Sequence, residues 1–324
     1  MAKRRRVVVA FGGNALIRRG EEGTQTEQIE NSERLARRLV ALVGERDELL
    51  LVHGNGPQVG TILIQVEEAV TKVPPVSLDL CVAQSQGSIG YLLERSLVNR
   101  LRARGTRREV VSLISQVVVE RSDPGFRKPS KPIGPFYTRY RAEYLAKRQG
   151  WLMVEDSGRG YRKLVPSPRP REVLCLGAIA DALKRGCIVI AGGGGGVPVY
   201  RDERGVLRGV EAVIDKDRTA GLLATELKAD LFVILTAVDR VYLNFGRPDQ
   251  LPVDRLSVSD VRRHLRDGQF PAGSMGPKME TAADFVEATG REVVITSVEK
   301  VKEALSGKSG TRIIPDARGR GRNS

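Results

Sequence analysis

Three lysines in this sequence stand in local settings that suit phosphate binding. They occur in Asp215-Lys216-Asp217, in Gly273-Ser274-Met275-Gly276-Pro277-Lys278 and at the start of Lys131-Pro132-Ile133-Gly134-Pro135. Glycine lets backbone N–H groups approach an anion, proline stiffens the loop, and lysine supplies the charge. The first setting is also typical of an exposed ion pair at a helix start, and loop lysines are commonly solvated. Because only 13 of the 53 basic residues are lysines, these three are nevertheless conspicuous.

Glycine clusters follow three short apolar runs. These clusters are Gly12-Gly13-Asn14, Gly54-Asn55-Gly56 and Gly192 to Gly196. Each is expected at the carboxyl end of a buried strand, the edge where open α/β sheets bind ligands. A single cluster is compatible with an ordinary tight turn, but three on one edge favour an anion-binding crevice.

Two common nucleotide-binding fingerprints are not met. A GxGxxG motif beginning at Gly54 would need glycine where Val59 stands. Gly307-Lys308-Ser309 resembles the end of a P-loop, but Lys302 occupies the position of its first glycine. Any nucleotide must therefore be held in another way.

The residues available for catalysis favour phosphoryl transfer. His53 and His264 are the only histidines, and no CxxC pair is present, which leaves little for a zinc or Ser-His-Asp mechanism. We expect His53 to be a neutral histidine at a strand end. Transfer to an acceptor that is already an oxyanion needs positioning and charge but no general base. The expected metal is Mg²⁺, held mainly by nucleotide phosphates and helped by a carboxylate such as Asp217.

The helices and strands that must position these residues are predicted to form an α/β fold. Between the apolar runs lie helical patterns, such as Leu35, Leu39 and Leu42 with Ser32 as a candidate N-cap. Repeated strand and helix predict a parallel sheet with helices on both faces. The predicted strands are Val7 to Phe11, Leu49 to His53, Val110 to Ile114, Ile188 to Ala191, Leu231 to Thr236 and Val293 to Thr296.

One long segment interrupts this alternation. Residues 122–170 are rich in Pro, Gly, Arg and Tyr, and we interpret them as a small protruding subdomain over the site. It is inserted into a single domain spanning residues 1–315, and residues 316–324 are expected to form a disordered basic tail.

Composition limits the partners and the compartment. The net charge is +14, and both Lys3-Arg4-Arg5-Arg6 and the Arg318 to Arg322 tail could contact phosphate backbones. The charge is spread along the chain without a nucleic-acid-binding module, so nucleic acid is not the expected partner. Three cysteines without CxxC spacing suit a reducing compartment, and neither a signal peptide nor a membrane span is predicted. We therefore expect a cytoplasmic protein.

Taken together, the motifs closely resemble those of carbamate kinases in the amino acid kinase family. The resemblance runs in order from about Val7 to Thr296. Two residues that flank the Gln84-Ser85-Gln86 motif, Val82 and Ser88, depart from the usual pattern of the family, and the Arg-rich tail is also unusual. The motifs are Gly12 to Leu16, His53 to Gly60, Ala83-Gln84-Ser85-Gln86-Gly87, Lys131 to Tyr137, Val210 to Asp217 and Gly273 to Lys278.

This resemblance implies an α/β fold of the open αβα sandwich type, with a mainly parallel central sheet and the small protruding subdomain, assembled as a homodimer. It also implies a place in arginine metabolism and the reaction ATP + carbamate = ADP + carbamoyl phosphate with Mg²⁺. The direction that makes ATP is expected because carbamoyl phosphate is a strong phosphoryl donor.

The same resemblance assigns the site residues. Catalysis would use Lys131, Lys216, Lys278 and Asp217; the acceptor and γ-phosphate would contact Gly12, Gly13, Asn14, Gly54, Asn55 and Gly56; the nucleotide would contact Thr236, Asp239, Tyr242, Met275 and Gly276.

Some alternatives stay open. Lys131 is preferred to Lys128 because it adjoins Pro132-Ile133-Gly134. A sister kinase acting on another small carboxylate or phosphate, or a nucleotide-binding regulator without turnover, would share much of this pattern. The Arg-for-Lys bias is compatible with heat adaptation or with codon composition.

Overall fold

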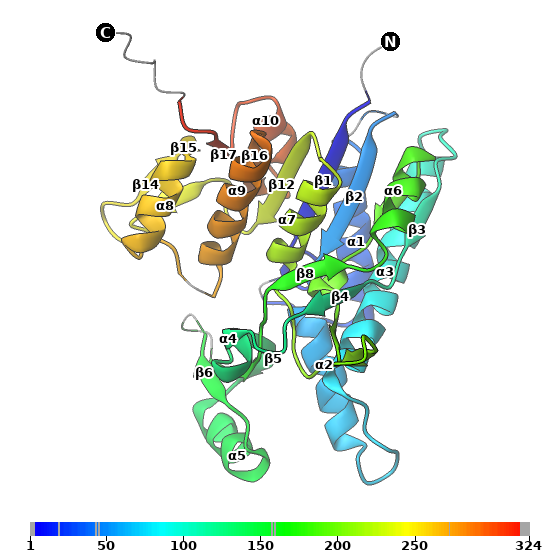
Figure 1. Ribbon diagram of the computed structural model, residues 1–324, viewed down its shortest axis with the longest axis vertical. Helices are drawn as coiled ribbons and strands as arrows, with labels where there is room; N and C mark the ends of the chain where they lie inside the picture. The colour runs from blue at the N-terminus through cyan, green and yellow to red at the C-terminus, as the bar shows by residue number, and fades with distance from the viewer. Residues whose placement is uncertain are drawn as a thin grey trace.

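A mainly parallel sheet forms the centre of the computed structural model (Figure 1). The structure describes residues 4–18, 20–42, 44, 46–156, 158, 160–271 and 273–317. Within these ranges, eight strands are ordered β15-β17-β16-β12-β1-β2-β9-β3, and every pair is parallel except β16 with β17. The strands are β1 (Arg6–Phe11), β2 (Glu48–His53), β3 (Val110–Ser112), β9 (Ile188–Ile190), β12 (Leu231–Thr236), β15 (Arg255–Ser257), β16 (Val293–Ser297) and β17 (Thr311–Ile314).

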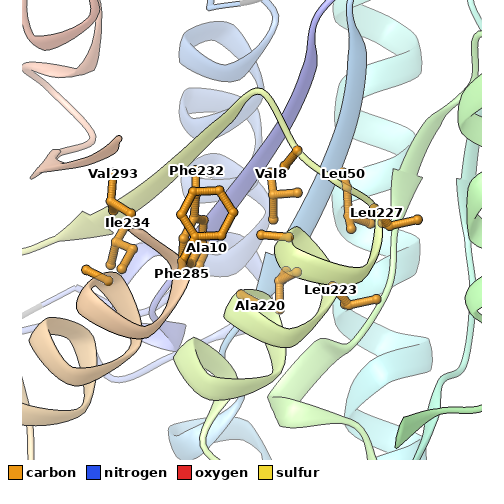
Figure 2. Close-up of a cluster of buried hydrophobic side chains, with 14 of the residues drawn as sticks. Val8, Ala10, Leu50, Ala220, Leu223, Leu227, Phe232, Ile234, Phe285 and Val293 are labelled. Carbon is orange, nitrogen blue, oxygen red and sulfur yellow. The ribbon is translucent and has the colours of Figure 1, made fainter. Parts of the chain in front are cut away.

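Helices cover both faces of the sheet because its strands are apolar on both sides. In β1, Val8 and Ala10 point into one core, and Val7, Val9 and Phe11 point into the other. Figure 2 shows the first core, where Phe232 of β12 stacks edge to face on Phe285 at 5.5 Å between ring centroids. On that side lie α6 (Leu176–Lys184), α7 (Lys216–Glu226), α8 (Val258–Arg266) and α9 (Met275–Thr289); on the other lie α1 (Gln25–Leu39), α3 (Leu78–Arg102) and α10 (Val301–Leu305).

These layers confirm the predicted α/β fold with a mainly parallel sheet. All six predicted strands lie in the central sheet. The prediction that Ser32 caps a helix was wrong: Ser32 lies inside α1, buried, and its hydroxyl donates to the carbonyl of Gln28. The helix begins one residue after Thr24, whose side chain forms a capping box with Glu27.

The segment 122–170 contains regular structure of its own. It holds α4 (Pro124–Arg127), α5 (Arg139–Gln149) and a small antiparallel sheet of β5 (Lys131–Tyr137), β7 (Tyr161–Val165) and β6 (Met153–Glu155). In Figure 1 these elements extend away from the central sheet. A third apolar cluster, which includes Val59, Ile133 and Val165, packs β5 and β7 against α2 (Gly56–Glu68).

The remaining strands form two smaller units. The order β11-β10-β4-β8 gives a second sheet, and β13 pairs with β14 as a hairpin. Their bounds are β4 (Gln116–Val119), β8 (Pro170–Val173), β10 (Val197–Arg201), β11 (Leu207–Gly209), β13 (Val241–Leu243) and β14 (Leu251–Val253).

The chain ends and cysteines bear on the predictions from composition. Arg5 pairs with Asp47 and Arg6 with Glu48, so part of the basic N-terminal tract has partners within the fold. Lys3 and residues 318–324 of the predicted tail lie outside the described residues. All three cysteines carry free thiols. In the part of the chain that the structure describes, no helix has the length and hydropathy needed to cross a membrane.

Candidate active site

Three lysines and two aspartates from different elements meet at one point. Asp215 is the N-cap of α7 and accepts a hydrogen bond from the backbone N–H of Asp217 at 2.9 Å. One oxygen of Asp217, Oδ2, accepts from Lys216 Nζ at 3.0 Å and from Lys278 Nζ at 2.9 Å. Lys131 Nζ donates to Asp215 Oδ2. The cluster thus joins the starts of α7 and α9 to the first residue of β5.

Burial sets the electrostatics of this cluster. Burial alone would raise the pKa values of both aspartates, but for Asp215 the charges of Lys131, Lys216 and Lys278 outweigh it and lower the pKa. Lys216 and Lys278 likewise hold the pKa of Asp217 below its ordinary value. Both carboxylates are therefore ionised near neutral pH. The reading of Asp215-Lys216-Asp217 as an exposed ion pair is excluded, because all three residues are buried.

The pKa values of the two lysines that share Asp217 shift in opposite directions. Desolvation lowers the pKa of Lys216, and the charge of Asp217 opposes this incompletely. Desolvation also acts on Lys278, but the charges of Asp217 and Asp215 outweigh it and raise its pKa. We place both lysines in the ammonium form, since each lies within hydrogen-bonding distance of an ionised carboxylate.

Two glycine loops close around the stem of Lys216. A Cβ added to Gly54 would lie 2.7 Å from the backbone nitrogen of Gly13, 3.0 Å from Cδ of Lys216 and 3.3 Å from the carbonyl carbon of Gly12. The loop from β1 continues into η1 (Gly13–Ala15), which contains Asn14, and the loop from β2 continues into α2. Backbone N–H groups at two parallel strand ends are therefore held beside the lysines.

The third glycine cluster supports the second loop. A Cβ on Gly193 would lie 2.2 Å from Nε2 of His53, and one on Gly194 would lie 2.1 Å from Nδ2 of Asn55. Asn55 donates its side-chain N–H to Ser85 Oγ at 2.8 Å, which ties the loop to α3. Burial lowers the pKa of His53 to about 4, so it is neutral at physiological pH as predicted.

The protruding segment brings Lys131 to the cluster through close backbone packing. A Cβ on Gly60 of α2 would lie 1.9 Å from the Cα of Gly134 in β5, so neither backbone could approach the other with a larger residue at position 60. Arg162 of β7 donates from Nε to the carbonyl of Gly134 at 2.9 Å. Its guanidinium lies 3.6 Å from the position of a Cβ on Gly56 at the start of α2.

The predicted nucleotide-side residues lie in two places: three at or after the carboxyl end of β12, and two at the start of α9. Thr236 ends β12, which pairs in parallel with β1 so that Leu235 faces Phe11. Tyr242 donates to Asp239 Oδ1 at 2.8 Å. Met275 and Gly276 begin α9, three and two residues before Lys278. Among the described residues, no hydrogen bond or ion pair joins Thr236, Asp239 or Tyr242 to the lysine cluster.

Two contributors were missed as site residues in the sequence. Asp215 pairs with Lys131 and caps the start of α7; its position before a helix start was the available signal. Ser115 exchanges two hydrogen bonds with Gln86, one in each direction, and accepts from the backbone N–H of Gly192 at 2.9 Å, which anchors the third glycine cluster. No sequence pattern around Ser115 indicates this role.

This arrangement can stabilise a transferring anion. Three ammonium groups and two sets of backbone N–H groups converge without a titrating base, which suits charge neutralisation. In the described part of the chain, no three His, Cys, Asp or Glu residues group as a metal site, although Asp217 Oδ1 is buried without a hydrogen-bond partner. One carboxylate oxygen is thus available beside the cluster, which fits Mg²⁺ held mainly by phosphates.

Comparisons with known proteins extend over nearly the whole chain. The amino acid kinase family profile matches residues 5–297. A carbamate kinase from Thermococcus kodakarensis is 45% identical over 313 residues, covering 96% of this chain and 99% of that protein. Carbamate kinase 2 from Staphylococcus epidermidis is 45% identical over 311 residues, covering 95% and 99%.

Solved structures agree with these sequence matches. The carbamate kinase from Giardia lamblia bound to citric acid superposes with a TM-score of 0.92 at 38% identity, covering 98% of this chain and 100% of that one. The same enzyme bound to AMP-PNP gives a TM-score of 0.87 at 39% identity, with the same coverage.

Proposed function

The chain belongs to the carbamate kinases of the amino acid kinase family, and on that premise we propose that it catalyses ATP + carbamate = ADP + carbamoyl phosphate. The observation that carries the proposal is the convergence of Lys131, Lys216 and Lys278 on Asp215 and Asp217 beside the glycine loops. Such a cluster neutralises charge that develops during phosphoryl transfer.

In the forward reaction, a carbamate oxygen attacks the γ-phosphorus of ATP. A new O–P bond forms as the bond from that phosphorus to the bridging oxygen of ADP breaks. Carbamate is already an anion, so no proton has to be removed. Lys216 and Lys278, held by Asp217, neutralise the transferring oxygens, and Lys131 does so from the protruding segment. The N–H groups of Gly12, Gly13, Asn14, Asn55 and Gly56 orient the acceptor and the γ-phosphate. Gly54, whose own N–H donates to the carbonyl of Phe11, lets the second loop lie close against the first.

The nucleotide is held on the side of α9 and β12. Thr236, Asp239, Tyr242, Met275 and Gly276 would contact ATP or ADP. This proposal is supported by the position of Thr236 at the carboxyl end of β12 and by that of Met275 and Gly276 in the same helical turn as Lys278. Mg²⁺ bound with the nucleotide would neutralise its phosphates, and Asp217 Oδ1 is the protein oxygen available to support it. Residues 122–170 act as a subdomain that covers the site.

The quaternary state and the compartment complete the proposal. Exposed apolar side chains on α3 and next to the edge strand β3 support a homodimer: Leu80 is 49%, Tyr91 60% and Ile114 59% exposed. Free thiols at all three cysteines support a reducing compartment such as the cytoplasm. Carbamoyl phosphate is a mixed anhydride and a strong phosphoryl donor, so we infer that the enzyme is used to make ATP.

The decisive assay is ATP formation from ADP, Mg²⁺ and carbamoyl phosphate by the purified protein. The Lys216→Ala variant should lose turnover, whereas Lys184→Ala, which changes an exposed lysine on α6, should keep it. Acetyl phosphate in place of carbamoyl phosphate tests which acyl phosphate the enzyme accepts as phosphoryl donor in this direction. Preference for acetyl phosphate would favour a sister kinase, and ADP binding without turnover would favour a regulator.

A further inference from the structure

A basic pocket lies between α1, α3 and α10, on the face of the sheet opposite α7 and α9. Its volume is about 410 Å³, within the range of small-molecule sites. We call it the α1–α3 basic pocket. None of its residues belongs to the lysine cluster; they are Arg34, Arg37, Arg38, Ala41, Arg100, Glu299, Val301 and Lys302.

The cations of this pocket lack partners among the residues that the structure describes. Five cationic side chains face one carboxylate, Glu299, so positive charge is in excess. Across the described residues, none of the five takes part in an ion pair or a side-chain hydrogen bond. The Nε atoms of Arg34 and Arg100 are even buried without an acceptor. A buried donor left unpaired is unfavourable, and the pairing would be supplied by an acceptor entering the pocket.

Several arginines elsewhere in the protein do have carboxylate partners. Arg262 bonds both Asp284 and Glu287, and Arg312 bonds Glu292. A second arginine-rich hollow, around Tyr200, contains Arg201 paired with Glu172 and Arg208 paired with Asp202. The α1–α3 basic pocket therefore differs from that hollow in the pairing of its charges, not in the number of arginines alone.

The electrostatic setting of Arg34 also favours an anion. Burial is the largest cause that lowers the pKa of Arg34, and the charges of Arg18 and Arg37 lower it further, while Glu299 and Glu21 oppose them. A multivalent anion between α1 and α3 would stabilise the charge of Arg34 and accept from several guanidinium groups at once.

The lining defines the chemical class of the ligand. Planar guanidinium groups match phosphate oxygens in a two-pronged geometry, and four arginines suit an anion with several phosphate oxygens. The lining holds no aromatic side chain on which a nucleobase could stack. We propose that the α1–α3 basic pocket binds a compact multivalent phosphate, of the pyrophosphate or tripolyphosphate type, at a second site independent of the lysine cluster.

The test is isothermal titration of the full chain with inorganic tripolyphosphate at low ionic strength. The variant Arg34→Gln/Arg100→Gln should bind at least about tenfold more weakly, since it loses two charge-assisted donors. The matched control Arg201→Gln/Arg208→Gln removes the same charge from the second hollow and should bind as the wild type does. The variant Lys131→Ala/Lys278→Ala reports on the lysine cluster and should retain this binding.

Three results would overturn the proposal: no binding by the wild type, equal weakening in the matched control, or loss of binding only in the lysine variant. Should the Arg34→Gln/Arg100→Gln chain fail to fold, single Arg37→Gln and Arg38→Gln variants replace it, because both side chains are exposed and line the same pocket. Unchanged affinity in both would then refute the site.

Discussion

A single methyl group at Gly54 should separate the two glycine loops. In Gly54→Ala, the new Cβ would lie 2.7 Å from the backbone nitrogen of Gly13, well inside ordinary contact. Relief requires the loops to part by about 0.7 Å, and a displacement on the order of 1 Å at a catalytic site lowers rates by about 100-fold. Gly54 cannot simply swing away, because its N–H donates to the carbonyl of Phe11 at 2.7 Å. Crowding of this kind also lowers the free energy of unfolding by about 1–3 kcal/mol.

The assay compares kcat/KM for ATP formation and the free energy of unfolding in urea. Gly177→Ala is the matched control, because a Cβ at this position in α6 meets nothing within 4 Å. It should keep full activity and should not lose stability, because the added methyl group displaces no neighbouring atom. A folded Gly54→Ala protein with kcat/KM within about threefold of the wild type would show that the contact between the loops does not position the reacting groups.

Three further outcomes are expected. Lys131→Ala should lower kcat/KM by about 100-fold or more, as the loss of one preorganised electrostatic donor does. Lys128→Ala changes an exposed lysine and should keep a kcat/KM near that of the wild type. Equal losses in the two variants would refute the assignment to Lys131. Asp217→Asn leaves two buried ammonium groups without their shared carboxylate, so urea denaturation should show a loss of about 3–5 kcal/mol, and an unchanged midpoint would argue against the buried pairing. Burial lowers the pKa of His53 in the folded state to about 4, so the unfolded chain takes up the proton at a higher pH than the folded protein does. The free energy of unfolding should therefore fall by roughly 3 kcal/mol as the pH drops from about 6.5 to about 4. That acid-dependent loss should shrink in His53→Gln but not in His264→Gln.

Much of the fold follows from local sequence. Runs such as Leu231 to Thr236 are apolar on both faces, and a strand with no polar face must be buried on both sides. The strands β15 and β17 were missed because they are short and carry polar residues, including Arg255 and Arg312. Their pairing at the edge of the sheet depends on neighbours far away in sequence.

The position of helix α1 shows a different limit. Ser32 had the residue type of an N-cap, but the helix begins earlier, at the Thr24 capping box. Residue type alone did not distinguish a cap from a serine that bonds the carbonyl four residues earlier.

The sequence by itself determined the parts of the site that are local: the glycine loops at strand ends, and Lys216 and Lys278 in the first turns of two helices. Only the tertiary structure decided that both lysines share one oxygen of Asp217, that Asp215 pairs with Lys131, and that Ser115 anchors the third glycine cluster. The physical reason is that strand ends and helix starts depend on short-range backbone preferences. Pairing between residues 84 positions apart, as for Lys131 and Asp215, depends on how the whole chain packs.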